Sequence, residues 1–287
     1  MEEATTVKSC ETGAPLPASA ESTAPARETG GAAGFLRQTL ALAEMELRKL
    51  RHDPTELITR IIQPALWLGV FGEVFSRVRA IPTGQLRYLD FMAPGVLAQS
   101  VLFIAIFYGI AVIWERDLGI VHKLLVSPAP RLTLVLGKAL SAGVRALPQG
   151  LMVYLLAWLL GVKINWNPAA LAGVALAILL GAAAFSTLSL IVACIVKTRE
   201  RFMGIGQALT MPLFFASNAV YPISIMPEWL KTLARVNPLT YEVDAMRALM
   251  IQGGSSVFGV GLDLLVLLAA SMALTAVASR LYPNLAR

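Results

Sequence analysis

Charged side chains are scarce in this 287-residue sequence, where Asp, Glu, Lys and Arg together make up 15% against about a quarter in a typical soluble domain. They are missing altogether from residues 91–114, 164–196 and 202–227. Each of these runs exceeds the ~20 residues that a helix needs to cross a bilayer core. With 56% hydrophobic residues, the composition excludes an ordinary soluble domain and predicts an all-α, polytopic membrane protein.

Cysteine and histidine are nearly absent. The two cysteines, Cys10 and Cys194, lie far apart, and the two histidines, His52 and His122, are scattered. This distribution argues against a disulfide framework, and we expect no metal site.

Motifs for catalysis are missing as well. The sequence has no GxSxG, HExxH or GxxxxGK[ST] motif, and Gly137-Lys138 is followed by Ala139. A membrane enzyme is therefore disfavoured, and we expect no cofactor on this chain. The predicted second to fifth spans contain no Asp or Glu, which ion-coupled carriers use to bind their ion. An ion-coupled secondary transporter is thus the weaker alternative from another class.

Six transmembrane helices are expected, at about residues 57–76, 91–113, 137–161, 170–196, 202–219 and 257–279. Residues 1–34 lack large apolar side chains and are expected to be a disordered tail. Residues 35–52 carry an apolar stripe and are expected to form an amphipathic helix on the membrane surface.

The basic residues indicate the orientation of the chain. Of the 24 Lys and Arg residues, sixteen lie on the side of both termini and seven on the opposite side, with Arg145 left out. Because cytoplasmic loops carry the excess of Lys and Arg, both termini are expected in the cytoplasm. The same distribution, confined to connections between spans, argues against a nucleic-acid partner.

The longest polar interruption in the first half of the chain is residues 114–131. Its apolar residues are spaced as on one helix face, and Ser127-Pro128 and Pro130 end the pattern. The segment predicts a short amphipathic helix between two spans, which either anchors them at the surface or docks on a soluble partner. Its stripe and charged rim comprise Trp114, Glu115, Arg116, Asp117, Leu118, Val121, Lys123 and Leu125.

A second irregular segment, residues 220–254, separates the predicted fifth and sixth spans. Prolines at 222, 227 and 238 divide it, and the residues from Tyr241 to Met250 are spaced as in an amphipathic helix. We expect this helix on the outer face, as a surface or re-entrant element.

Two features lie within the predicted spans. Gly173, Ala177 and Gly181 form a stripe of small residues that lets another helix approach closely. Arg145 is placed near the start of the third span, either contacting an anionic substrate or extending to the nearer membrane surface.

Three stretches resemble the permease subunits of type-2 ABC exporters, most closely the daunorubicin-resistance branch. These are ERDLGIVHKLLVSPAPRLTLVLGK (115–138), YPISIMPEWL (221–230) and NPLTY with VDAMR (237–247). The resemblance covers roughly residues 35–280, within an expected transmembrane domain of 35–287. The pair His122-Lys123 departs from the usual basic-first order, and the first 34 residues have no counterpart.

The resemblance implies a role for each stretch. Residues 114–131 would be the coupling helix that docks on a separate ABC ATPase, which binds ATP and magnesium. The family's motif after the fifth span comprises Pro222, Pro227, Asn237, Pro238, Tyr241, Asp244 and Arg247.

The resemblance also implies an assembly and an activity. Two permease copies, identical or different, would join two ATPases and export an amphipathic or hydrophobic, drug-like compound across the bacterial inner membrane. Export of a lipid-linked glycan or polysaccharide is the alternative within the same family.

Overall fold

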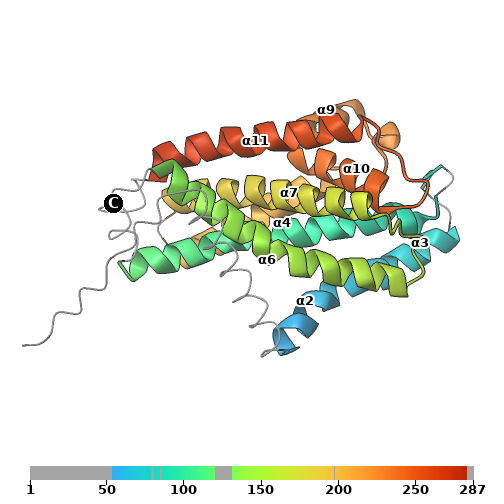
Figure 1. Cartoon of the computed structure of the whole chain (residues 1–287), viewed down its shortest axis with the longest axis horizontal. Helices are drawn as coiled ribbons and strands as arrows, with labels where there is room; N and C mark the ends of the chain where they lie inside the picture. Colours follow the sequence, from blue (N-terminus) through green and yellow to red (C-terminus); the bar gives the residue numbers. More distant parts are fainter. Residues whose placement is uncertain (1–53, 79–80, 85, 120–130, 197, 283–287) are drawn as a thin grey trace, which may run out of the picture.

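The computed structural model describes residues 54–78, 81–84, 86–119, 131–196 and 198–282. They form a bundle of helices that share one long axis (Figure 1). In chain order the elements are α2 (Pro54–Leu66), the π-helical η1 (Trp67–Gly72), α3 (Glu73–Val78), α4 (Tyr88–Asp117), α6 (Arg131–Leu159), α7 (Pro168–Ile195), α8 (Arg199–Phe215), the 3₁₀ turn η2 (Ile223–Ile225), α9 (Glu228–Val236), α10 (Pro238–Met250) and α11 (Val260–Leu281). The predicted tail at 1–34 and surface helix at 35–52 lie outside the described residues.

Four helices of the described part are long and apolar enough to cross a membrane: Tyr88–Asp117, Leu134–Leu159, Pro168–Ile195 and Val260–Leu281. They coincide with the predicted second, third, fourth and sixth spans. The predicted first span falls in α2, η1 and α3, and the fifth falls in the 17-residue α8. Neither is among the four, so the six-span topology stays a prediction.

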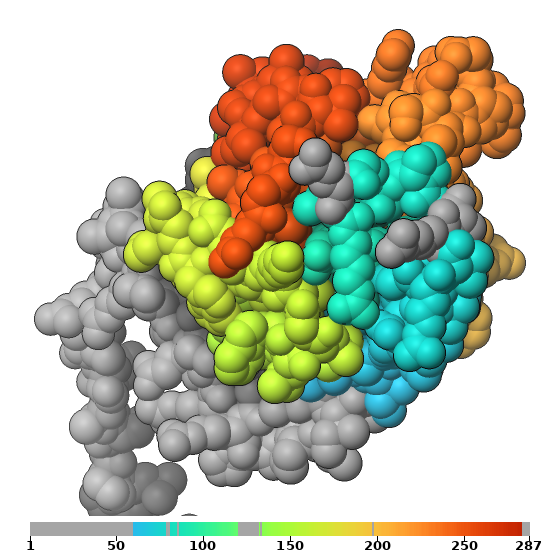
Figure 2. Space-filling model, turned by 90° about the vertical axis from the view of Figure 1, so that its right-hand side faces the viewer, coloured from blue at the N-terminus to red at the C-terminus, as the bar shows by residue number. Residues whose placement is uncertain are grey.

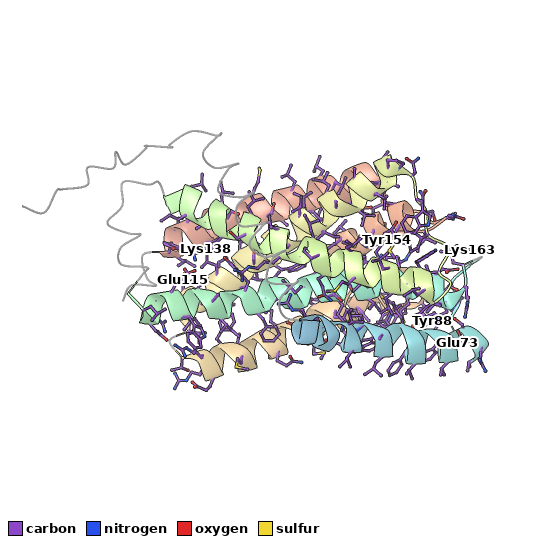
Figure 3. All side chains as sticks on the ribbon, turned by 60° about the horizontal axis from the view of Figure 1, so that its bottom comes forward. Glu73, Tyr88, Glu115, Lys138, Tyr154 and Lys163 are labelled. Carbon is purple, nitrogen blue, oxygen red and sulfur yellow. The ribbon has the colours of Figure 1, made fainter. Side chains whose placement is uncertain are left out.

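The bundle has two distinct ends, which we name by residues of α4. The Asp117 end holds the last turn of α4 and the first turns of α6 and α8. The Tyr88 end holds the start of α4, the end of α6 and the start of α7. Figure 3 separates them, with Glu115 and Lys138 at one end and Glu73, Tyr88, Tyr154 and Lys163 at the other.

Helix α7 is the centre of the bundle and packs against α4, α6, α10 and α11. Its start is fixed by Asn167, whose side chain accepts a hydrogen bond from the Ala169 amide, and by Pro168 at the first helical position. Between α7 and its neighbours lies a continuous apolar core that contains the fully buried Leu97, Phe185 and Met246.

The stripe of small residues on α7 is where α10 packs. A Cβ atom added to Gly173 would lie 2.8 Å from Leu249, and one added to Gly181 would lie 2.3 Å from the Glu242 carboxyl carbon. Because Leu249 faces Gly173 and Glu242 faces Gly181, the two helices are antiparallel. The predicted close approach of another helix is confirmed.

Helix α10 lies inside the bundle, against α4, α7 and α11. Nine of its residues are buried, among them three with ionisable side chains: Glu242, Asp244 and Arg247. This burial contradicts the surface alternative for α10 and is compatible with the re-entrant one. The preceding α9 fits the surface alternative better, since it buries only Ala234 and exposes Trp229, Leu233 and Val236. In Figure 2, which looks onto the Tyr88 end, the segment around α9 projects as the orange corner.

Candidate functional site

The predicted coupling segment does not begin as a separate helix. Trp114, Glu115, Arg116 and Asp117 form the last turn of α4, so the second span continues four residues beyond its predicted end. The helix ends at Asp117 with Leu118 as its C-cap, and Gly119 then adopts a φ of 71°, a left-handed conformation that glycine tolerates. The predicted start at Trp114 is wrong because polar residues alone do not interrupt a helix.

Charged pairs tie three helices together at this end. Lys138 of α6 pairs with Glu115 of α4 (Figure 3). Arg199 of α8 donates to the Asp117 carboxylate at 2.7 Å and lies 3.8 Å above the Trp114 ring. The frame that flanks residues 120–130 is therefore fixed by side chains from α4, α6 and α8.

Apolar surface accompanies these charges. Trp114 is 50% exposed and Leu118 is 69% exposed, beside a rim of paired charges. Exposed apolar residues within a charged rim are typical of a protein-binding surface. The remaining predicted coupling residues, Val121, Lys123 and Leu125, lie outside the described residues.

Away from these charged pairs, Asn237 joins α8 to α10. Its side-chain oxygen accepts from the Leu239 amide and caps α10, with Pro238 at the first helical position. Its side-chain amide donates to the carbonyls of Leu213 and Ala216, at 2.7 and 3.3 Å. Asn237 therefore satisfies carbonyls at the end of one helix while it starts another.

Arg247 of α10 is buried and bound on three sides. It donates to the Asn218 carbonyl at 2.7 Å and to the Phe91 carbonyl at 3.4 Å, and its guanidinium lies 3.8 Å above the Phe91 ring. Its predicted partner Asp244 is 3.8 Å away. The predicted pair exists, but the shorter contacts of Arg247 run to α4 and to the residues after α8.

Asp244 holds the loop that leads into α11. One of its oxygens accepts from the amides of Val257 and Phe258, at 2.7 and 3.2 Å, and lies 2.8 Å from the Ser256 hydroxyl. The same hydroxyl lies 2.8 Å from the Asp263 carboxylate. Asp244 and Arg247 thus act as one buried network that links α4, α8, α10 and α11.

The other residues of this motif lie around that network. The Tyr241 hydroxyl donates to the Arg235 carbonyl at 2.6 Å. Pro227 precedes α9, where the Lys231 ammonium holds the pKa of Glu228 below its usual value. Pro222 lines a cavity of about 130 Å³ together with Arg247. The structure therefore brings Asn237, Asp244 and Arg247 into direct contact with neighbouring helices and leaves Pro222, Pro227 and Tyr241 at their edge.

Several residues of this end were missed from the sequence. Asn218 contacts both Asp244 and Arg247, Ser256 lies between two carboxylates, and the buried Asp90 accepts from the Lys163 amide at 3.2 Å. The only sequence feature that pointed to these residues was their position near the ends of predicted spans. Glu242, fully buried beside α7, had no such signal.

Arg145 lies in the middle of α6 rather than near the start of a span. It is 14 residues from Arg131 and 14 from Leu159, about 21 Å from either helix end at 1.5 Å per residue. The guanidinium therefore lies far from both ends of α6. Its guanidinium lies 5.0 Å from the centre of the Tyr108 ring.

A cavity of about 310 Å³ opens beside this pair, between α2, α4 and α6. Arg60 of α2 lines the same cavity. The Gln149 side chain of α6 donates to the Arg60 carbonyl at 3.3 Å. Aromatic and aliphatic side chains of α4 line the rest: Phe103, Ile104, Phe107, Tyr108 and Ala111. The lining combines aromatic rings with two guanidinium groups.

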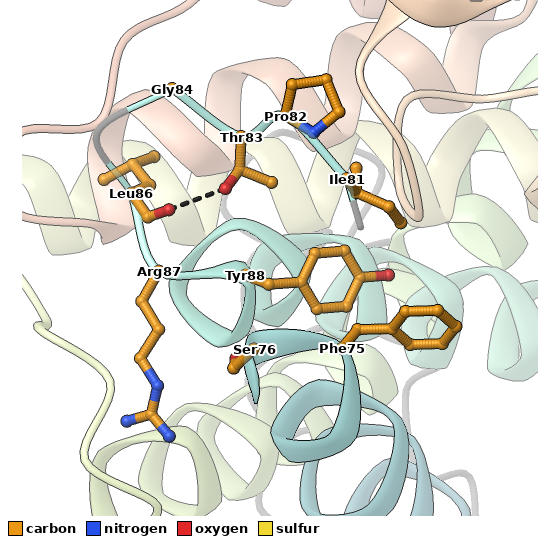
Figure 4. Close-up of a pocket in the computed structure, with 9 residues that line it drawn as sticks. All are labelled: Phe75, Ser76, Ile81, Pro82, Thr83, Gly84, Leu86, Arg87 and Tyr88. Carbon is orange, nitrogen blue, oxygen red and sulfur yellow. Dashed lines mark hydrogen bonds between the residues drawn. The ribbon is translucent and has the colours of Figure 1, made fainter. Parts of the chain in front are cut away.

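A larger recess of about 620 Å³ lies at the Tyr88 end, between α3 and the loop that enters α4 (Figure 4). The Phe75 and Tyr88 rings stand 5.4 Å apart on one side, and Thr83 donates to the Leu86 carbonyl at 2.7 Å on the other. The Tyr88 hydroxyl donates to the Val220 carbonyl at 3.0 Å. These contacts join the start of α4 to the segment after α8.

The described residues contain no group of three His, Cys, Asp or Glu side chains placed to hold a metal ion. They do contain buried carboxylates outside the predicted second to fifth spans, at Asp90, Glu242, Asp244 and Asp263. The sequence argument against ion coupling considered only those four spans and did not include these carboxylates.

Comparison with known proteins gives a consistent match. The family described as ABC-2 type transporter matches residues 37–251. A putative transport permease, ycf38, of Cyanophora paradoxa is 28% identical over 217 residues, covering 75% of this chain and 74% of the relative. The daunorubicin resistance ABC transporter permease protein DrrB1 of Streptomyces coeruleorubidus is 25% identical over 260 residues, covering 91% and 89%. Nodulation protein J of Sinorhizobium fredii is 27% identical over 230 residues, covering 79% and 83%.

Proposed function

Because the chain belongs to the ABC-2 type transporter family, we propose that it is the permease of an exporter that moves an amphipathic or hydrophobic, drug-like compound out of a bacterial cell. Permease subunits of this family are non-catalytic membrane components, and the ATPase is a separate subunit. The proposal includes ATP hydrolysis, with magnesium, on that partner chain.

The proposal rests on the ion pairs that join α4, α6 and α8 at the Asp117 end. The helices that enter and leave residues 120–130 are α4 and α6, and the Glu115–Lys138 pair links them. Asp117 and Arg199 extend the link to α8. A partner that moved the segment 120–130 would therefore act on three helices together. We assign the sequence 114–131 the role of transmitting ATP-driven motion.

Orientation and assembly follow from the same role. The Asp117 end is proposed to face the cytoplasm, with both termini on that side of the inner membrane, and two permease copies are proposed to pair around the transport path. A cysteine placed at Ser255, an exposed residue at the Tyr88 end, should react with an impermeant thiol reagent in intact cells. Reaction only after permeabilisation would reverse the orientation.

The cavity beside Arg145 is the proposed contact for the exported compound. Its volume of about 310 Å³ is at the lower limit for drug-sized ligands. The rings of Phe103, Phe107 and Tyr108 suit an aromatic compound. Arg145→Gln should raise the concentration of an anionic aromatic compound needed for half-maximal export by roughly tenfold, which corresponds to ~1.4 kcal/mol. If the dependence of the export rate on compound concentration were unchanged, the cavity would not be part of the transport path.

The test of the function is reconstitution of the full-length permease with its partner ABC ATPase. Inverted proteoliposomes should accumulate daunorubicin, the compound in a relative's name, only when ATP is supplied. An ATPase without its phosphate-binding lysine is the matched control.

Other outcomes would revise the proposal. Accumulation driven by an ion gradient without ATP would favour a secondary transporter. ATP-dependent movement of a lipid-linked glycan, without movement of daunorubicin, would assign the chain to glycan export.

A further inference from the structure

Glu242 has an environment unlike that of any other acidic residue in the described part of the chain. Its side chain is fully buried in α10, and neither carboxyl oxygen has a hydrogen-bond partner among the described residues. The carboxyl group faces Gly181, where an added Cβ would lie 2.4 Å from both oxygens. Glycine at this position makes room for the carboxyl group.

The position of Gly181 places Glu242 at the middle of the bundle. Gly181 is 13 residues from Pro168 and 14 from Ile195, about 20 Å from either end of α7. Within α7 the backbone amides are already engaged in the helix. The helix therefore offers no free N–H group that would stabilise a carboxylate.

No described cation compensates the carboxyl group. Helix α7 carries no charged residue. The other charged groups of α10, Asp244 and Arg247, are bound to each other, to Asn218 and to the loop before α11, and the Tyr241 hydroxyl donates to the Arg235 carbonyl. The charged residues of the other helices packed against α10 make no hydrogen bond with Glu242; they are Asp90, Glu115, Arg116 and Asp117 of α4, Glu228, Lys231 and Arg235 of α9, and Asp263 and Arg280 of α11.

We propose that Glu242 is a proton-binding site of the permease core, occupied when α10 is packed against α7. An ionised carboxylate without a partner is strongly disfavoured in such a site, whereas the neutral acid is tolerated. Loss of the proton would draw the carboxylate toward water and move α10 off the small-residue stripe. Asp244 and Arg247 also lie on α10 and bind its neighbours at the Tyr88 end. Binding or loss of the proton at Glu242 therefore controls how these elements pack.

Infrared spectroscopy of the purified full-length permease tests the proton directly. The difference spectrum between wild type and Glu242→Gln at neutral pH should contain the carbonyl band of a protonated carboxylic acid, shifted in heavy water. Glu200→Gln, which changes an exposed acid of α8, is the matched control and should lack that band. A difference spectrum showing only a carboxylate band would overturn the proposal.

The pH dependence of stability provides the second readout, independent of any ATPase. Glu242 binds a proton in the folded state that it loses in the unfolded state at neutral pH, so stability should fall as the pH rises. The ratio of folded to unfolded protein should fall by up to about tenfold for each unit of pH increase. Glu242→Gln should remove that component of the slope, and Glu200→Gln should keep it.

Two results would contradict the proposal. Equal slopes for wild type and Glu242→Gln would show that no proton is bound. A wild-type stability that rises with pH relative to that of Glu242→Gln would show that the ionised carboxylate is the stabilised form.

Discussion

Glu115 and Lys138, 23 residues apart in the sequence, pair across the Asp117 end, and the Lys138 side chain is only 13% exposed. The pair joins the last turn of α4 to the early part of α6, on either side of the undescribed segment 120–130. Because both helices flank the proposed coupling segment, the pair is well placed to keep their movements together.

Lys138→Met should therefore weaken both stability and coupling. Removal of one partner from a half-buried pair is expected to cost roughly 1–3 kcal/mol, between the values for exposed and buried pairs. Thermal unfolding and substrate-stimulated ATPase activity are the measurements. The exchange Glu115→Lys with Lys138→Glu should restore much of both losses.

Lys231→Met is the matched control, since Lys231 pairs with the exposed Glu228 within α9. Its effect on the thermal midpoint should be small, because the pair is exposed to solvent. Equal effects of Lys138→Met and Lys231→Met would show that the Glu115–Lys138 pair has no special role.

Arg247→Ala should lower the amount of folded protein without changing which compounds are exported. The substitution removes the donor to Asn218 and Phe91 and leaves Asp244 without its cation, which is expected to cost roughly 3–5 kcal/mol. Yield of monodisperse protein and the thermal midpoint measure the loss. Arg235→Ala, on the exposed α9, should be mild. A changed substrate profile at full yield would instead place Arg247 on the transport path.

The sequence predicted the parts of this fold that depend on composition. Charge-free runs located α4 and α7, apolar composition located α6 and α11, and the small residues of α7 predicted a close helix contact. Which helix would fill that contact was not predictable, because α10 has a surface-like composition with Glu242, Asp244 and Arg247. Its burial depends on distant partners such as Asn218 and Val257.

The errors at the two candidate regions have the same origin. A polar run after Ile113 indicated a new helix, yet α4 continues to Asp117, where Lys138 and Arg199 pair with its acidic residues. Arg145 was placed near the start of a span predicted from residue 137, whereas α6 begins six residues earlier.

Gly95→Ala tests the contact between α4 and the segment after α8. A Cβ at this position would lie 2.5 Å from the Ala219 carbonyl oxygen and 2.8 Å from its Cα, so backbone must move. We expect a loss of roughly 1–3 kcal/mol from overpacking. Gly204→Ala in α8 meets no atom within 4 Å and should instead be neutral or stabilising by up to ~1 kcal/mol. A thermal midpoint for Gly95→Ala equal to that of Gly204→Ala would refute this close approach.

The coupling role of residues 114–131 is tested most directly by charge on its apolar stripe. Leu118 is 69% exposed at the end of α4, so Leu118→Asp should leave the permease folded. A groove on the ATPase that buries this side chain would gain roughly 1.5–3 kcal/mol from it, and an aspartate would forfeit at least that. Leu125→Asp and Val121→Asp, on the predicted continuation of the stripe, should behave alike, and His122→Ala should be mild.

The expected phenotype is a permease that reaches the membrane at the wild-type level but no longer co-purifies with the ATPase or supports substrate-stimulated ATP hydrolysis. Val236→Asp is the matched control, because Val236 is 77% exposed on α9 at the opposite end and should leave both readouts intact. A simple surface anchor predicts the reverse, namely loss of permease from the membrane with normal ATPase binding in what remains. Wild-type co-purification and activity for Leu118→Asp and Leu125→Asp would exclude the coupling role, since a docked helix cannot accept a buried, unpaired carboxylate without losing affinity.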